Sequence, residues 1–492
     1  MGTSQHTETH VLLNKHIAIS IITIGVIIMI ANLLTLESII LSTWITSITG
    51  LIIIWIIWWK NHEGKDLIDS STMVLFGLSF THLLPPLYLS LRLEDSIAAD
   101  VFNVAGTYAL TNILTTFGAI ALLIGYYFVR MCSVGEKKHK TLHTVNMKTT
   151  NIIIFLLSIF IIVWTARIIL LKSGTYYFIN VDSSFMGGRW FSVLAQISYY
   201  GLMLPMMLWL MSHKYKRWLL WAWIFTIIEL IWVIPTGGRQ YTIQVCLSLI
   251  LVKIKNLREI PWVKLFLIGI VIIIAFPIIG QLRYTSGKYL DINEFNLGIS
   301  QYQAFKEATE VVKESDSALN ILDDVVSRFY DGQFLGYLLE HYRYDFEWEW
   351  GNTYLERLPY IFIPYFINPD RPIMQVPLGQ WYQLIGGGSQ PTTYFGEAYI
   401  NFGYLGIPPM GFVLGVILGL FENLFRKFPG STLFTAAYIF FIVTFIYKVS
   451  ASLGSWLADM RNIVLFTILI YSMNILFDQG IIGFKRERGK IQ

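Results

Sequence analysis

Residues 327–372 read SRFYDGQFLGYLLEHYRYDFEWEWGNTYLERLPYIFIPYFINPDRP, and residues 386–406 read GGGSQPTTYFGEAYINFGYLG. Both stretches belong to 282–405, the only long segment that is too polar to lie in a membrane, and apolar segments precede and follow it. Structureless loops of more than about 12–15 residues are uncommon unless they are functional or disordered. Disordered segments are poor in aromatic residues, whereas this segment is dense in them. We therefore expect it to fold as a cap over a membrane bundle and to carry the chemistry.

The composition is that of a membrane protein. Of the 492 residues, 55% are hydrophobic and only 14% are charged, against about 25% charged in soluble domains. The net charge of +4 is small for this length, which argues against nucleic-acid binding. The two cysteines, Cys132 and Cys246, exclude a disulfide framework and a Cys/His metal cluster.

Twelve apolar segments have about the 20-residue length that crosses a bilayer. The third contains Pro85-Pro86, which a membrane helix tolerates when neighbouring groups satisfy the freed backbone. The segments are 17–36, 39–59, 72–91, 104–129, 151–171, 191–211, 218–235, 240–254, 263–281, 406–425, 431–450 and 462–482.

Clusters of Lys and Arg follow the even-numbered segments. The positive-inside rule places those loops and both termini in the cytoplasm, so that 282–405 faces outward. We therefore predict an all-α polytopic membrane protein with about twelve transmembrane helices. Its parts are an N-terminal membrane bundle of about nine spans (1–281), the large extracytoplasmic segment (282–405) and a C-terminal three-span segment (406–492).

Arginines on the outward side are the first candidates for chemistry, since they run against the positive-inside bias. A guanidinium is permanently charged, and its planar fork of donors matches phosphate oxygens. Several that converge near the outer leaflet would suit a diphosphate. Alternatively, each pairs with a nearby carboxylate or extends toward lipid headgroups. We single out Arg239 because the two glycines before it let a ligand approach closely. The full set is Arg189, Arg239, Arg283, Arg328, Arg357 and Arg371.

Two ionisable residues fall within predicted spans, Glu229 in the seventh and Arg167 in the fifth. Such residues are costly in a bilayer and indicate function by default. A structural hydrogen bond between helices is an equally open reading of Glu229. The spacing to Arg239 corresponds to about 15 Å along a helix, so we expect no contact between these two.

The run DFEWEW places Asp345, Glu347 and Glu349 at a period of two. The alternating carboxylates would hold a divalent cation, or they form the solvated face of a strand with aromatic residues on its other face. We favour the strand. The run GGGSQPTT at 386–393 lacks the lysine and helix of a phosphate-binding P-loop, which favours a hinge or lid.

His341 and Glu397 are the candidates for a general base. Each lies among aromatic residues suited to stacking on sugars. Base catalysis requires a group whose pKa the site can tune. For His341 a surface or packing role is the competing interpretation.

The motif GEAYINFGYLGI (396–407) resembles the signature at the end of the large periplasmic loop in Wzy-type oligosaccharide repeat-unit polymerases, the O-antigen polymerase family. Further upstream Arg328, the run GNTY (351–354) and the proline-rich run LPYIFIPYFINPDRP (358–372) are similar to that loop, and the GGRQ turn (237–240) resembles the family's arginine-bearing turn. The chain departs from the family pattern at Pro364-Tyr365 and at Arg371-Pro372.

The resemblance implies a GT-C-like, metal-independent glycosyltransferase of the bacterial inner membrane, with no cofactor. It would move a growing glycan from its undecaprenyl-diphosphate carrier onto another lipid-linked repeat unit, and a Wzz-type chain-length regulator would be a partner. The leaving diphosphate needs preorganised cations, for which we propose Arg239, Arg283, Arg328 and Arg371. Either Glu397 or His341 would act as base. Substrate would be bound by Arg189, Arg371, Tyr354, Tyr399 and Asn401.

Three other functions remain open. A lipid-linked oligosaccharide flippase also has about twelve spans, but flippases generally have short loops and charges deep in a central cavity. A metal-dependent GT-C-like enzyme would use the DFEWEW carboxylates, although those enzymes usually carry their acidic pair in the first outer loop, here only Thr35–Ser38. An O-antigen ligase differs only in its acceptor.

Overall fold

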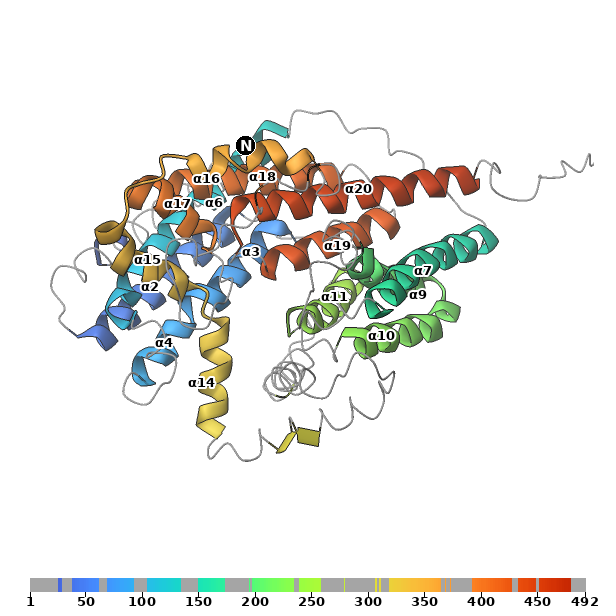
Figure 1. Cartoon of the computed structure of the whole chain (residues 1–492), viewed down its shortest axis with the longest axis horizontal. Coiled ribbons are helices and arrows are strands. Elements are labelled where there is room, and N and C mark those ends of the chain that lie inside the picture. The colour runs from blue at the N-terminus through green and yellow to red at the C-terminus, as the bar shows by residue number, and fades with distance from the viewer. Residues whose placement is uncertain are drawn as a thin grey trace, which may run out of the picture.

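The computed structural model describes residues 25–28, 38–61, 69–92, 104–133, 149–172, 194, 197–233, 239–257, 278, 306–307, 309–310, 318–363, 368, 372, 392–426, 432–447 and 451–478. Within these ranges every regular element is helical (Figure 1). Four helical stretches there are long and apolar enough to cross a membrane, namely Ile39–Asn61, Ser70–Arg92, Ala105–Cys132 and Tyr394–Phe425. For the described residues, the prediction of an all-α protein with helices long and apolar enough to cross a membrane is therefore confirmed.

Helices lie over predicted segments two to eight and ten to twelve, whereas 17–36 and 263–281 fall almost wholly outside the described residues. The third segment, which contains Pro85-Pro86, is helical but is not one regular α-helix. The stretch is divided into α3 (Ser70–Leu78), the π-helical turn η1 (Ser79–Leu83), α4 (Pro85–Leu89) and η2 (Ser90–Arg92). The two prolines occupy the first positions of α4, where a missing backbone N–H is tolerated.

Among the described helices, the most extensive contact joins α6 (Tyr108–Ser133) to α18 (Ile407–Arg426). Three glycines of α18 recur every fourth residue, and the backbone of α6 approaches them so closely that an added Cβ would meet it. Gly411 faces Gly118, and Gly415 faces the carbonyl of Leu122. Small residues at this spacing let membrane helices pack backbone against backbone. The spacing of these glycines is visible in the sequence, but by itself it does not identify the partner helix.

A second group contains α7 (Thr149–Lys172), η5 (Tyr200–Leu202), α9 (Met203–Lys214), α10 (Leu219–Val233) and α11 (Arg239–Leu257), and it lies to the right in Figure 1. Aromatic contacts join it to the C-terminal helices α19 (Thr432–Tyr447) and α20 (Leu453–Asp478). The ring centroid of Tyr199 lies 4.9 Å from that of Phe440, and Tyr200 stacks on Phe466 at 4.1 Å.

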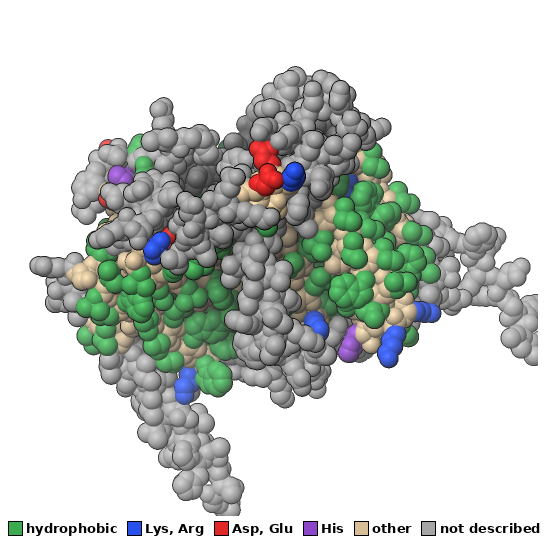
Figure 2. All heavy atoms as spheres, turned by 90° about the horizontal axis from the view of Figure 1, so that it is seen from below, with side chains coloured by type: hydrophobic (Ala, Val, Ile, Leu, Met, Phe, Trp, Pro, Cys, Tyr) green, Lys and Arg blue, Asp and Glu red, His purple; other side chains and the backbone are tan. Residues whose placement is uncertain are grey.

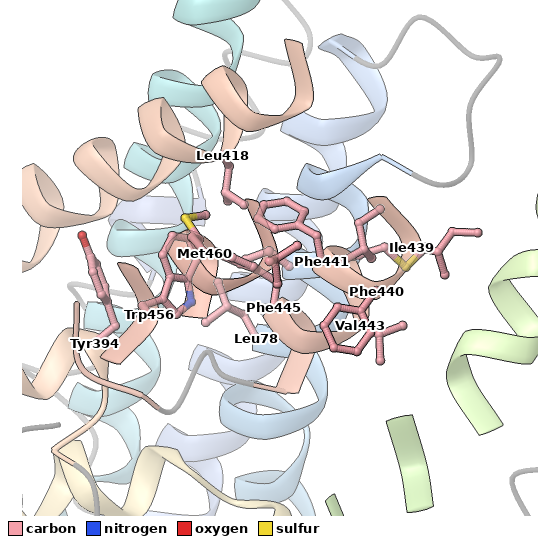
Figure 3. Packing of buried hydrophobic residues seen from close by; sticks show 14 of the residues in the cluster. Leu78, Tyr394, Leu418, Ile439, Phe440, Phe441, Val443, Phe445, Trp456 and Met460 are labelled. Atoms are coloured by element: carbon pink, nitrogen blue, oxygen red, sulfur yellow. The ribbon is translucent and has the colours of Figure 1, made fainter. Parts of the chain in front are cut away.

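The hydrophobic core between α3, α18, α19 and α20 combines aliphatic and aromatic side chains (Figure 3). Phe441 and Phe445 point toward Leu418 on one side and Trp456 on the other. On the outside, Figure 2 shows a broad band of hydrophobic side chains across one face, with acidic side chains along its upper border. A surface of this kind suits the hydrocarbon interior of a bilayer.

The described part of the predicted cap contains α14 (Ala318–Phe329), α15 (Gly332–Asp345), α16 (Asn352–Leu355), η8 (Leu358–Phe362), α17 (Tyr394–Phe402) and η10 (Gly403–Gly406). Polar contacts hold it to α4 and η2. Asp323 of α14 pairs with Arg92 at 3.1 Å and accepts from the Tyr88 hydroxyl at 2.6 Å. The backbone N–H of Asp331 donates to the Thr81 carbonyl at 2.9 Å.

The predicted strand at DFEWEW is wrong. Asp345 ends α15, Phe346 is extended, and residues 346–349 belong to no strand. Instead, the N–H groups of Glu349 and Trp350 donate to the carbonyls of Ile400 and Asn401, at the C-terminal end of α17. The last carbonyls of a helix have no partner within the helix. Here they accept hydrogen bonds from the N–H groups of Glu349 and Trp350, which in a sheet would donate to a neighbouring strand.

Candidate functional site

The structure describes the predicted arginines only in part. Arg189, Arg283 and Arg371 lie outside the described residues. Arg239 is the first residue of α11, and Arg328 lies in the last turn of α14. For these two residues the structure describes the backbone position but not the side chain. The convergence of these arginines on one ligand therefore stays a prediction.

The GEAYINFG motif folds as the short helix α17, and its sequence explains both ends. Thr393 caps the start, where its hydroxyl accepts from the Gly396 N–H at 3.1 Å. Gly403 ends the helix at φ +64°, a conformation that glycine adopts without strain. The side chains of residues 394–401 are buried, whereas that of Phe402 is exposed. The motif is thus a buried helix that joins the cap to α18.

Glu397 lies at the centre of a hydrogen-bonded cluster and is only 1% exposed. Its Oε1 accepts from the Thr353 hydroxyl at 3.1 Å, and its Oε2 accepts from the Leu453 N–H at 2.7 Å. Leu453 is the first residue of α20, so the carboxylate lies at the positive end of that helix dipole. Among the described side chains, no Lys or Arg forms an ion pair with it.

Asn401, one turn further along α17, completes the cluster. Its Nδ2 donates to the Thr353 hydroxyl at 2.6 Å and to the Glu397 carbonyl at 2.8 Å, and its Oδ1 accepts from the Gly351 N–H at 2.9 Å. Residues of GNTY and of GEAYINFG, two motifs separated in sequence by more than forty residues, therefore form one unit. Thr353 joins them, although we had not selected it from the sequence.

A buried arginine flanks this cluster. Arg357 is 5% exposed, follows Thr353 by one turn, and donates to its carbonyl at 3.1 Å. It also pairs at 3.3 Å with Glu356, whose side chain is 61% exposed. Arg357 was one of the outward arginines in the sequence, but nothing in its sequence environment ranked it above the others.

A second arginine, Arg461 of α20, reaches the same part of the cap. Its Nη1 donates to the Ile361 carbonyl of η8, and its Nε and Nη2 donate to Asn462 Oδ1 at 2.9 and 2.7 Å. Our sequence reading missed it. The available signal was its position directly before the predicted segment 462–482, on the side that the sequence predicts to face outward.

The tyrosines assigned to substrate binding are packed in the core. The Tyr399 ring lies 5.2 Å from Trp348 and 5.3 Å from Tyr404, and Tyr354 stacks on Phe402 at 6.4 Å. Burial, with the nearby Glu397 as a second cause, raises the pKa of the Tyr354 hydroxyl well above its usual range. These tyrosines thus shape the site, and neither offers an open ring face to a sugar.

His341 differs from Glu397 in accessibility. It is half-buried on α15, with its ring 4.5 Å from that of Tyr337. The helix that carries it packs on α17, where Leu338 contacts Gly396 and Tyr342 lies 6.4 Å from Tyr399. The two candidate bases therefore belong to adjacent helices, and no contact between them is described.

The carboxylates of DFEWEW show no metal-binding geometry in the described residues. Glu347 is exposed and Glu349 half-buried. Within the described ranges, no group of three His, Cys, Asp or Glu side chains lies close enough to hold a metal ion.

Glu229 forms a buried ion pair with Arg167. The guanidinium donates to both carboxylate oxygens, at 2.9 and 2.6 Å, and to the Ser198 carbonyl at 3.0 Å. It also lies over the Trp164 and Trp232 rings, at 5.3 and 4.8 Å from their centroids. The ion pair therefore favours a structural role for Glu229, in which it links α10 to α7.

Comparison of this chain with protein-family models, curated proteins and solved structures gave no match.

Proposed function

We propose that this chain is a membrane glycosyltransferase that polymerises undecaprenyl-diphosphate-linked oligosaccharide repeat units. In this proposal it spans the bacterial inner membrane about twelve times in a GT-C-like arrangement, with both termini cytoplasmic and 282–405 outside. The reaction transfers the growing glycan from its lipid diphosphate to the sugar of a new lipid-linked unit. It takes no metal or cofactor, and a Wzz-type chain-length regulator is a further partner.

The observation that carries the proposal is the cluster of Thr353, Glu397 and Asn401. It joins GNTY to GEAYINFG, two of the runs on which the family resemblance rests. The cluster lies next to the first residue of α20 and shortly before α18 begins. It therefore lies at the first residue of α20 and close to the start of α18, which belongs to a stretch apolar enough to cross a membrane. We place the headgroup of the lipid-linked substrate beside it.

The arginines are proposed to stabilise the leaving group. When the bond between the anomeric carbon and the diphosphate oxygen breaks, negative charge develops on the diphosphate, and preorganised cations lower its free energy. Arg357 and Arg461 join the proposed set because both are anchored beside η8. The others are Arg239, Arg283 and Arg328, with Arg189 and Arg371 as substrate-binding residues.

The proton of the acceptor hydroxyl needs a base when that oxygen forms the new glycosidic bond. Both oxygens of Glu397 already accept hydrogen bonds, and the side chain is buried. We therefore assign Glu397 to positioning α16 and α20, and His341, the more accessible of the two, to proton transfer. Undecaprenyl diphosphate leaves, and the proton remains on the imidazole until it is released to water.

The test uses purified protein in lipid with a short undecaprenyl-diphosphate oligosaccharide and no nucleotide sugar. We expect a ladder of products that persists in EDTA and is lost in Arg357→Ala. Arg217→Ala is the matched control, because Arg217 is an exposed arginine of η6 (Lys216–Trp218), which this proposal places on the cytoplasmic side, and its guanidinium lies over the Tyr215 and Trp218 rings. It should retain the ladder.

Three outcomes would contradict the proposal. A full ladder in Arg357→Ala removes Arg357 from the site. Loss of the ladder in EDTA supports the metal-dependent alternative. Movement of the lipid-linked sugar across the bilayer without any ladder supports a flippase.

A further inference from the structure

An exposed apolar patch lies on the described part of the cap. Phe362 of η8 is 80% exposed. Trp350, which lies before α16, is 72% exposed, and Leu355, the last residue of α16, is 71% exposed. Leu405 of η10 is 85% exposed. Phe402 and Tyr404 are exposed beside it. We call these six residues the outer apolar patch.

The two halves of the patch belong to one surface. Tyr354 of α16 stacks on Phe402 at 6.4 Å. The Trp350 N–H donates to the Asn401 carbonyl at 3.1 Å, directly before Phe402. Residues 350–355 are therefore held against the end of α17, and η8 follows directly.

Two independent markers give the depth of this patch relative to the membrane helices. The first is α18, which begins at Ile407, two residues after Leu405. Exposed apolar residues continue along α18 at Val413, Leu420 and Leu424. The patch is thus continuous with the surface of a helix that is apolar enough to cross the membrane.

The second marker is α20. Its first nine residues include Asp459 and Arg461, and an apolar run starts immediately after Asn462. Arg461 donates to the Ile361 carbonyl of η8, and Ile361 packs on Ala458. Arg461 lies eight residues after Leu453, about 12 Å along a helix. Therefore η8 lies beside α20 at the polar-to-apolar boundary and not above the helix end.

The residue types fit that depth. Aromatic rings are enriched where the hydrocarbon meets the headgroups. The polar face of the same short segment carries Glu356, which is exposed and pairs with Arg357. An element with an apolar face and a charged face suits the plane of the interface.

From these observations we infer that α16, η8 and η10 lie in the outer headgroup region of the bilayer, with the outer apolar patch against lipid acyl chains. The described part of the cap then contacts the membrane surface, and the Glu397 cluster lies at the depth of the lipid headgroups. This inference does not depend on the proposed enzymatic function, because it concerns only where the segment lies.

The test measures the depth of single labels. Cys132→Ser and Cys246→Ser remove the native thiols, and Phe362→Cys, Leu405→Cys and Glu356→Cys are labelled one at a time with a small fluorophore. All three side chains are exposed, so the core is unchanged, and two patch positions keep the test valid if one variant fails to fold. The proteins are reconstituted into phosphatidylcholine–phosphatidylglycerol vesicles with acyl-brominated lipid, or with iodide on both sides.

We expect severalfold stronger quenching by brominated lipid at positions 362 and 405 than at 356, and the reverse order with iodide. Quenching of all three labels by iodide alone would mean that the patch faces water. Protection of 362 and 405 from both quenchers would mean that protein covers the patch. Either result overturns the inference.

Discussion

Two buried glutamates, Glu229 and Glu397, are held in different ways. Arg167 meets both oxygens of Glu229, so the charge is neutralised within the pair and the contact joins α7 to α10. Glu397 instead accepts from a hydroxyl and from the N–H at the start of α20. Among the described side chains it has no ion pair.

This difference in partners distinguishes Glu229, whose charge has a structural role, from Glu397, whose environment suits a substrate-binding site. In a buried bidentate ion pair, each charge is held by the other, because separating them would leave an unpaired buried charge. Neither partner is therefore free to bind a ligand. A carboxylate held by neutral donors can respond to added positive or negative charge nearby. Burial alone therefore does not identify a functional carboxylate, because the kind of partner decides.

The largest effect is expected at the ion pair. Arg167→Ala leaves Glu229 buried without a cation and should lower the stability by about 3–5 kcal/mol. The measurement is the thermal stability of the purified protein in detergent. The double variant Arg167→Met/Glu229→Leu should recover most of the loss, because neither charge then remains. A single variant as stable as the native protein would contradict the pairing.

A smaller effect is expected at Glu397. Glu397→Ala removes the acceptor of two buried hydrogen bonds and should cost about 2–3 kcal/mol. Glu397→Gln keeps one acceptor oxygen and should be milder. If Glu397 positions rather than takes the proton, Glu397→Gln should retain part of the activity, and its pH–rate profile should keep the native shape. A profile that loses its acidic limb would assign the proton transfer to Glu397, because a general base must be deprotonated to act.

A still smaller loss of stability is expected at Thr353. Thr353→Val keeps the shape and removes the hydroxyl that donates to Glu397 and accepts from Asn401. We expect a loss of about 1–2 kcal/mol, measured by the same thermal assay. Thr353→Ser restores the hydroxyl and is the matched control. Equal stability of the two variants would show that the hydroxyl does not hold the two motifs together.

The smallest effect is expected at Glu356. Its pair with Arg357 has one exposed partner, and such pairs contribute about 0–1 kcal/mol. Glu356→Gln should leave the thermal stability within about 0.5 kcal/mol of native. A larger loss would mean that Arg357 depends on Glu356 for its position, and would weaken the comparison between the two glutamates.

The sequence allowed part of the site to be predicted. Glu397, Asn401 and Tyr354 were selected, and the structure brings them into one region. Thr353 was missed because a threonine carries no distinctive signal until its hydroxyl has a partner. Arg167 and Glu229 were each noticed, but their pairing was not, since it depends on how two helices face each other.

By itself, the sequence determined the class of fold and the positions of most helices, because an apolar run of about 20 residues is a local property that is read without neighbours. The predicted start of segment ten at 406 and the helix start at Ile407 agree for that reason. Only the tertiary structure decided which partners the buried charges have. It also decided that DFEWEW ends a helix and then hydrogen-bonds to α17. These outcomes depend on contacts between residues tens of positions apart, which the period of a short run cannot encode.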